Sequence, residues 1–268
     1  MKKLKTESMC PEKSFDTFER FTGRVENYVK YRPHYPKELL EIFQKKMGLS
    51  QDHVLADIGS GTGISAELFI KNANTVYAVE PNFEMRGAAE AFYVNTDLPG
   101  QFVSVDGTAE KTGLPADSVD YVIAGQALHW FDQELFLKEI RRILKPDGWL
   151  GFFWNSRSLA AGFNMDYNHF LERFAIDFSN MDEQEFRKTR MHEIFEKLTV
   201  EKLTNRQIFN IEGLMGRFLS SSYAPLPGTP DYQPMLKALD ALFFAHQKKG
   251  SIIFTYNVDL YYGKLPPF

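Results

Sequence analysis

Short apolar segments alternate with helical patterns in the central part of the chain. Five segments are apolar on both faces, as strands buried in a parallel sheet are: 54–58, 75–79, 101–105, 121–125 and 149–154. Apolar residues recur at helical spacing in three segments between them: 66–71, 84–95 and 133–144. This order of strands and helices predicts an α/β fold, a doubly wound sheet with helices on both faces.

The segment 133–144 is a well-marked predicted helix. Its apolar stripe consists of Leu135, Phe136, Ile140, Ile143 and Leu144. The residues at 145–148 (KPDG) supply a basic charge, a proline and a glycine, so they predict a turn that ends the helix and leads into the next strand.

The pattern changes after residue 155. Residues 156–196 are mostly helical in pattern, with charged residues and phenylalanines interspersed, and we interpret them as a helical insertion or lid. Strands are expected at 199–210 and 251–262, with helices at 212–220 and 234–247 between them. These elements would complete a Rossmann-like, mostly parallel seven-stranded sheet with an antiparallel edge strand.

Composition narrows the function classes. The net charge of −4 and the pI of about 5.9 provide no general basic field, so we expect no nucleic-acid partner. The single cysteine, Cys10, cannot by itself form an internal disulfide or a zinc site, which favours a reducing, cytoplasmic location. Polar residues follow the N-terminal lysines, and no stretch of about 18 apolar residues occurs, so neither a signal peptide nor a membrane span is expected.

A glycine-rich turn follows the strand predicted at 54–58. Residues 54–63 read VLADIGSGTG, with Asp57 two positions before Gly59. Open α/β sheets bind ligands at the carboxyl ends of their strands, and glycines let a ligand approach the backbone closely. The G-x-G-x-G spacing differs from the dinucleotide fingerprint G-x-G-x-x-G, and Asp57 would repel a pyrophosphate but attract a ligand with a free amine.

Two further strand ends carry acidic residues. Glu80 ends the next strand, about 20 residues beyond the glycines, where carboxylates accept hydrogen bonds from ribose hydroxyls. Glu80 therefore indicates a nucleoside ligand without choosing between NAD and S-adenosylmethionine. Residues 106–110 (DGTAE) follow the third strand and are placed to contact an adenine.

Taken in order, the motifs at 56–63, 79–81, 106–110 and 144–149 resemble the class I S-adenosylmethionine-dependent methyltransferases of the type 11 domain. The resemblance covers roughly residues 54–154 and implies S-adenosylmethionine as the cofactor. By position, it assigns the methionine part, the ribose and the adenine of the cofactor to these residues in turn: Asp57, Gly59, Ser60 and Gly61; Glu80; Asp106, Ala109 and Glu110.

Two other stretches are similar to a narrower branch, the small-molecule methyltransferases that include trans-aconitate methyltransferase. They are 28–36 (YVKYRPHYP) and 126–131 (QALHWF). The resemblance implies that the N-terminal segment covers the cofactor, and it adds cofactor contacts at Tyr28, Tyr31, Arg32 and Gln126. It also implies that His129 and Trp130 border the reaction chamber, with His129 as the candidate catalytic residue.

Four further residues are candidate substrate contacts. Trp154 and Arg157, at the far strand end, either line the chamber or pack. Arg217 and Tyr223 either bind an acidic substrate or serve a structural purpose such as capping a helix.

The resemblance also implies a domain organisation. We expect one domain over residues 1–268, with an N-terminal cofactor-covering segment (1–50), a cofactor-binding core (51–155), the helical insertion (156–196) and a C-terminal part that completes the sheet (197–268).

The expected activity is methyl transfer to a small-molecule acceptor, with a carboxylic acid as one candidate. No metal is expected, because a sulfonium methyl group is already activated. A carboxylate acceptor needs no base, whereas an amine or hydroxyl would use one such as His129. A noncatalytic S-adenosylmethionine-binding module is the alternative, and the glycine spacing and Asp57 disfavour a nicotinamide dehydrogenase. The sequence leaves the acceptor and the oligomeric state open.

Overall fold

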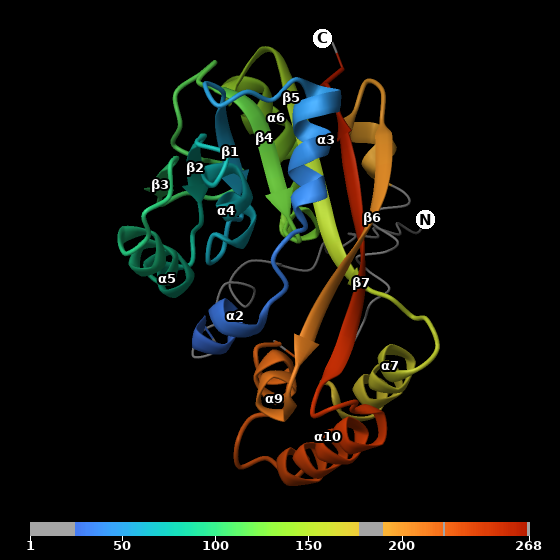
Figure 1. The fold of residues 1–268 in the computed structure, drawn as a ribbon. Coiled ribbons are helices and arrows are strands. Elements are labelled where there is room, and N and C mark those ends of the chain that lie inside the picture. Colours follow the sequence, from blue (N-terminus) through green and yellow to red (C-terminus); the bar gives the residue numbers. More distant parts are fainter. Residues whose placement is uncertain (1–24, 177–189, 222, 267–268) are drawn as a thin grey trace, which may run out of the picture.

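A seven-stranded sheet forms the centre of the computed structural model, which describes residues 25–176, 190–221 and 223–266 (Figure 1). The strand order is β3-β2-β1-β4-β5-β7-β6. The strands are β1 (Val54–Ile58), β2 (Thr75–Val79), β3 (Gln101–Val105), β4 (Val119–Gly125), β5 (Leu144–Arg157), β6 (Thr199–Phe209) and β7 (Ile252–Gly263). Strands β1 to β5 pair in parallel, and β7 pairs antiparallel with both β5 and the edge strand β6. The predicted fold class is confirmed, with the antiparallel strand one position in from the edge.

Helices cover both faces of the sheet. The helices are α2 (Val25–Tyr31), α3 (Lys37–Met47), α4 (Ile64–Ile70), α5 (Phe83–Val94), α6 (Gln133–Ile143), α7 (Phe163–Phe174), α9 (Ile211–Leu219) and α10 (Tyr232–His246), with a short 3-10 turn η1 (Leu128–Trp130). Helices α3, α4 and α5 share one core with the sheet, which includes Phe43, Phe69 and Phe153. Helix α6 and residues 191–195 bury the other face. Of these described helices, none is long and apolar enough to cross a membrane.

The predicted turn at 145–148 is wrong in detail. The structure begins β5 already at Leu144, which pairs with Val119, and the next pair joins Trp149 to Tyr121. The extra residues form an irregularity within the strand, where Asp147 has a φ of 67°. A bulge of this kind uses the same proline and glycine chemistry as a turn, so the local sequence does not separate the two.

The predicted stripe of α6 also needs correction, because Leu135 is 50% exposed. Phe136, Ile140 and Ile143 are fully buried, at the spacing of one helix face. Leu135 lies outside this narrower face.

A second, smaller core lies beyond the end of the main sheet. Figure 1 shows the long strands β6 and β7 running past the other strands to a group formed by α7, α9 and α10. Aromatic rings of α7 pack there on other elements, as Phe163 does on Phe254 of β7 and Phe170 on Phe218 of α9. Helix α7, from the predicted insertion, therefore packs with the C-terminal helices. Residues 190–194 of the insertion are helical and pack on the face of the main sheet that α6 covers. Residues 177–189 lie outside the described part.

Candidate cofactor and acceptor site

The glycine turn after β1 is left-handed at three positions. Gly59, Gly61 and Gly63 have φ values of 67°, 57° and 82°, which side chains other than glycine rarely adopt. A Cβ atom on Gly59 would lie 2.8 Å from the Cβ of Ala127, so the segment after β4 packs directly on the turn. A Cβ atom on Gly61 would have no other atom within 4 Å. The turn is therefore open to a ligand at Gly61.

Four N–H groups of this turn already donate within the protein. Those of Gly59 and Ser60 donate to the carbonyl of Val79 at 2.9 and 3.1 Å. The N–H of Gly61 donates to Glu80 Oε2 at 2.8 Å, and that of Gly63 to the Ser60 carbonyl at 2.9 Å. Phosphate-binding turns need free N–H groups that point at the anion. This turn is therefore poorly suited to a pyrophosphate.

Asp57 lies at the end of β1 with no exposed surface. Its Oδ2 accepts a hydrogen bond of 2.5 Å from the Ser65 hydroxyl, and its Oδ1 has no partner among the described residues. Burial raises the pKa of Asp57 to about 7, against the hydrogen bond from Ser65 and with a smaller contribution from the charge of Glu80. A buried carboxylate with a free oxygen is suited to bind a cation.

Glu80 lies at the end of β2 and is 9% exposed. One of its oxygens accepts from the N–H of Gly61 and the other from the N–H of Asn82, at 2.8 and 2.9 Å. Burial raises its pKa, although these hydrogen bonds oppose the effect. Each carboxylate oxygen keeps a further lone pair, so Glu80 can still accept from two neighbouring hydroxyls.

The residues after β3 have different surroundings. The Asp106 side chain is 74% exposed and pairs with Arg86 at 3.1 Å, and Arg86 also donates to the backbone carbonyl of Glu80. Ala109 is buried in the main core, and Glu110 accepts from the N–H of Asp132 at 3.0 Å. These contacts attach the predicted adenine segment to the Glu80 strand end on one side and to the start of α6 on the other.

Residues 28–36, here called the N-terminal strap, lie across the strand ends. The Asn205 amide donates to the His34 carbonyl at 2.6 Å and to Asn155 Oδ1 at 3.1 Å, which joins the strap to β6 and β5. The Tyr35 hydroxyl lies 2.8 Å from where a Cβ of Gly125 would be, over the end of β4. The strap therefore covers the ends of the central strands.

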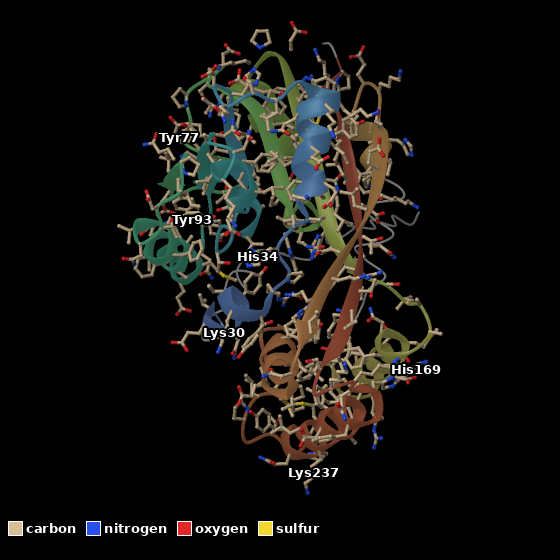
Figure 2. All side chains as sticks on the ribbon, in the orientation of Figure 1. Lys30, His34, Tyr77, Tyr93, His169 and Lys237 are labelled. Atoms are coloured by element: carbon tan, nitrogen blue, oxygen red, sulfur yellow. The ribbon has the colours of Figure 1, made fainter. Side chains whose placement is uncertain are left out.

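A pocket lies between the strap, the glycine turn and helices α4 and α5. Figure 2 labels two of its lining residues, His34 on the strap and Tyr93 on α5; Val29, Thr62, Gly63 and Glu67 also contribute. His34 Nδ1 lies 2.5 Å from Glu67 Oε2, and this hydrogen bond lowers the pKa of Glu67 to about 2. The contact fastens the strap to α4 beside the turn.

The segment after β4 contains Gln126 and the predicted chamber residues. Gln126 has a φ of 60°, and its amide donates to the Asn155 carbonyl at 3.2 Å. His129 is half-buried next to Trp130, with 4.8 Å between ring centroids, and Trp130 is 45% exposed. His129 and Trp130 are thus two and three residues after Ala127, which contacts the glycine turn.

Among the strap residues predicted to contact the cofactor, Arg32 and Tyr31 also contact α9 and the residue after it. Arg32 Nε donates to Ser220 Oγ at 3.1 Å, and the Arg32 guanidinium lies 4.7 Å from the centroid of the Tyr28 ring. The Tyr31 ring packs directly over Gly216 of α9. The Arg32 and Tyr31 side chains therefore face α9.

The four candidate substrate contacts separate into two groups. Arg157, Arg217 and Tyr223 lie together, with Arg157 Nη1 3.3 Å from the Tyr223 hydroxyl. Trp154 has no exposed surface and packs edge-on against Tyr261 in the core of the main sheet. Adjacent strand residues point to opposite faces, so Trp154 points away from the face that carries Asn155 and Arg157.

Three residues of the site were not predicted. Ser65 follows the glycine turn by two residues and fixes Asp57, and Tyr35 belongs to the strap motif without having been singled out. Asn155 connects the strap, β6 and Gln126. Ser65 had a usable signal, because the first turn of the helix after a glycine turn returns to the strand end.

Comparisons with known proteins find similarity to methyltransferases. Residues 56–152 match the model of a family described as a methyltransferase domain. An uncharacterised methyltransferase of Mycobacterium tuberculosis is 34% identical over 153 residues, which cover 57% of this chain and 59% of that protein. One of Schizosaccharomyces pombe is 30% identical over 138 residues, or 51% of this chain and 53% of that protein. The chain thus spans somewhat over half the length of these relatives.

Solved structures show the same fold. A proposed type II methyltransferase of Anaeromyxobacter dehalogenans aligns with a TM-score of 0.68 and 22% identity, over 89% of this chain and all of that one. A Haemonchus contortus phosphoethanolamine N-methyltransferase, solved with phosphomonomethylethanolamine and S-adenosylhomocysteine, aligns with a TM-score of 0.53 and 16% identity over 95% of this chain and 60% of that one. Residues 56–152 are therefore similar to a methyltransferase domain, and the chain shares the fold of these solved methyltransferases.

Proposed function

We propose that this protein transfers the methyl group of S-adenosylmethionine to a small-molecule acceptor. The observation that carries the proposal is the pair of buried acids at adjacent strand ends, Asp57 and Glu80, around a turn in which four N–H groups are already engaged. A nicotinamide dinucleotide would bring a pyrophosphate to this turn, and the charge of Asp57 and the engaged N–H groups both oppose it.

The described residues fit S-adenosylmethionine part by part. The free Oδ1 of Asp57 is the acceptor for the ammonium group of the methionine portion. Glu80 accepts hydrogen bonds from the two ribose hydroxyls. The part of the cofactor between the ammonium group and the ribose passes the open side of Gly61. Asp106, Ala109 and Glu110 follow the next strand, where we place the adenine.

The bound cofactor supplies an activated methyl group, and the protein supplies position and exclusion of water. Tyr35 and the strap cover the strand ends, so an acceptor is held against the cofactor in a restricted space. We assign His129 to accept a proton when the acceptor is an amine or a hydroxyl. A carboxylate acceptor is already ionised at neutral pH and uses His129 only as part of the wall.

The alternative is a noncatalytic module that binds S-adenosylmethionine and releases no product. Its cofactor residues would be the same, so only turnover separates the two functions. The strap and the half-buried His129 favour the enzyme, because a binding module needs no enclosed space beside the methyl group.

The test is release of S-adenosylhomocysteine from S-adenosylmethionine in the presence of three acceptor panels: small carboxylic acids, amines and hydroxyl compounds. The proposal expects product with one panel and loss of product in Asp57→Asn. Asp52→Asn is the matched control, because Asp52 is exposed before β1 and should retain full activity. Binding of S-adenosylmethionine without product from any panel would favour the noncatalytic module.

A further inference from the structure

Three arginines from distant parts of the chain converge beyond the end of β5. Arg32 follows α2, Arg157 ends β5 and Arg217 belongs to α9. Arg32 contacts Ser220 Oγ at 3.1 Å, Arg217 Nη1 contacts Ser221 Oγ at 3.2 Å, and Arg157 Nη1 contacts the Tyr223 hydroxyl at 3.3 Å. We call these three residues the arginine cluster.

The arginine cluster is rich in positive charge. Within the described residues, the side-chain hydrogen bonds of Arg32 and Arg217 go to hydroxyls and one carbonyl, and neither guanidinium pairs with a carboxylate. Burial, together with the neighbouring charge of Arg217, lowers the pKa of Arg32. Buried charges are normally paired, so the cluster is suited to an anion.

Two buried polar atoms in this place also have no hydrogen-bond partner among the described residues. Arg217 is 4% exposed, and its Nε donates to none of them. Tyr167 of α7 is 1% exposed, and its hydroxyl is likewise without one. Both interact electrostatically with Tyr223 and with each other, so they belong to one site. Buried donors of this kind point to a ligand that accepts hydrogen bonds.

The arginine cluster changes the pKa of a neighbouring tyrosine, Tyr223. Burial alone would raise its pKa, but the charges of Arg157, Arg217 and Arg32 lower the pKa to about 7. Tyr167 from α7 and Tyr256 from β7 complete the surroundings of the cluster. The positive charges that lower this pKa would equally favour an external anion at this place.

We infer that Arg32, Arg157 and Arg217 bind an oxyanion of the methyl acceptor, a carboxylate or phosphate group. Arg157 lies two residues, about 7 Å of extended strand, beyond Asn155, whose carbonyl accepts from Gln126. Arg157 and Tyr223 are half-buried, so the cluster has exposed surface for an incoming group. The identification of the anion as part of the acceptor rests on the proposed function.

The test measures anion binding by isothermal titration calorimetry at pH 8. Inorganic phosphate and succinate are titrated separately, with the uncharged succinamide as control. We expect phosphate, succinate or both to bind, and succinamide to give no binding. A response to phosphate alone assigns a phosphate-bearing ligand, and a response to succinate alone a carboxylate.

Variants connect this signal to the arginines. Arg157→Gln should weaken anion binding about tenfold or more. Arg206→Gln, which changes an exposed arginine of β6, should match the wild type. No binding of either anion, or equal anion binding by Arg157→Gln and the wild type, would overturn the inference.

This experiment does not depend on the proposed function. No cofactor is added, and Asp57→Asn should bind the anion as the wild type does. Failure of methyl transfer with a normal anion response would remove the proposed function and leave the oxyanion site. Loss of the anion response with normal turnover would remove the oxyanion site and leave the proposed function.

Discussion

Cofactor binding should weaken sharply as the pH falls below 7, because Asp57 must be ionised to hold the ammonium group. Burial raises the pKa of Asp57 to about 7, so the carboxyl is mostly protonated at pH 6 in the free protein. A neutral carboxyl cannot pair with a cation. The dissociation constant should therefore increase by about twofold at pH 7, roughly tenfold at pH 6 and about a hundredfold at pH 5, relative to high pH.

Isothermal titration with S-adenosylhomocysteine measures this directly, because the product keeps the ammonium group and lacks the labile methyl. At pH 6 the titration should also release close to one proton, visible as a heat that changes with the ionisation enthalpy of the buffer. Asp57→Asn should bind weakly at every pH, and Asp52→Asn should follow the wild type. A dissociation constant that stays flat between pH 5 and 8 in the wild type would refute the reasoning.

The same group makes the ligand-free protein pH-sensitive. The folded pKa of Asp57 lies above the unfolded value near 3.9, so the folded state holds the proton longer. The free energy of unfolding should therefore fall as the pH rises from about 4 to 7, by up to roughly 1.4 kcal/mol per pH unit from this group. Comparing urea denaturation of the wild type with that of Asp57→Asn isolates the contribution, and equal slopes against pH would contradict it.

Three other changes test separate parts of the site. Glu80→Gln should weaken S-adenosylhomocysteine binding by roughly ten- to a hundredfold, because it removes charged hydrogen bonds to the ribose; an unchanged titration would remove Glu80 from the ribose site. His129→Ala should lower turnover about a hundredfold or more if His129 is the base, and a loss near twofold would make it a wall residue. Gly216→Val should destabilise the fold by about 1–3 kcal/mol, because its side chain would meet the Tyr31 ring, and an unchanged melting temperature would contradict that packing.

The main sheet could be predicted because its signals are local. The strands β1, β2 and β4 are short apolar runs, mostly buried on both faces, and each predicted helix between the strands carries its own stripe. The errors fall where local chemistry is ambiguous: the bulge around Asp147 uses turn residues, and Leu135 borders the stripe without joining the core. The positions of Asp57 and Glu80 could be predicted because each lies at the end of a strand that the local pattern marks.

The contacts of the strap could not be read from the sequence. Arg32 meets Ser220 across 188 residues of chain, and no local pattern encodes that distance. A motif therefore indicated that the strap covers the site, while only the tertiary structure placed Arg32 beside Arg157 and Arg217. The place of Trp154 could not be predicted either, because a large aromatic residue at a strand end gives the same sequence signal whether it lines a site or fills a core.

The measurement that tests the central claim most directly is a calorimetric comparison of S-adenosylmethionine, S-adenosylhomocysteine and NAD at pH 8. We predict micromolar binding of both sulfur ligands, no detectable binding of NAD, and loss of the sulfur ligands in Asp57→Asn and Glu80→Gln but not in Asp52→Asn. Binding of NAD with no binding of either sulfur ligand would contradict the account and require another explanation for the acids around the glycine turn.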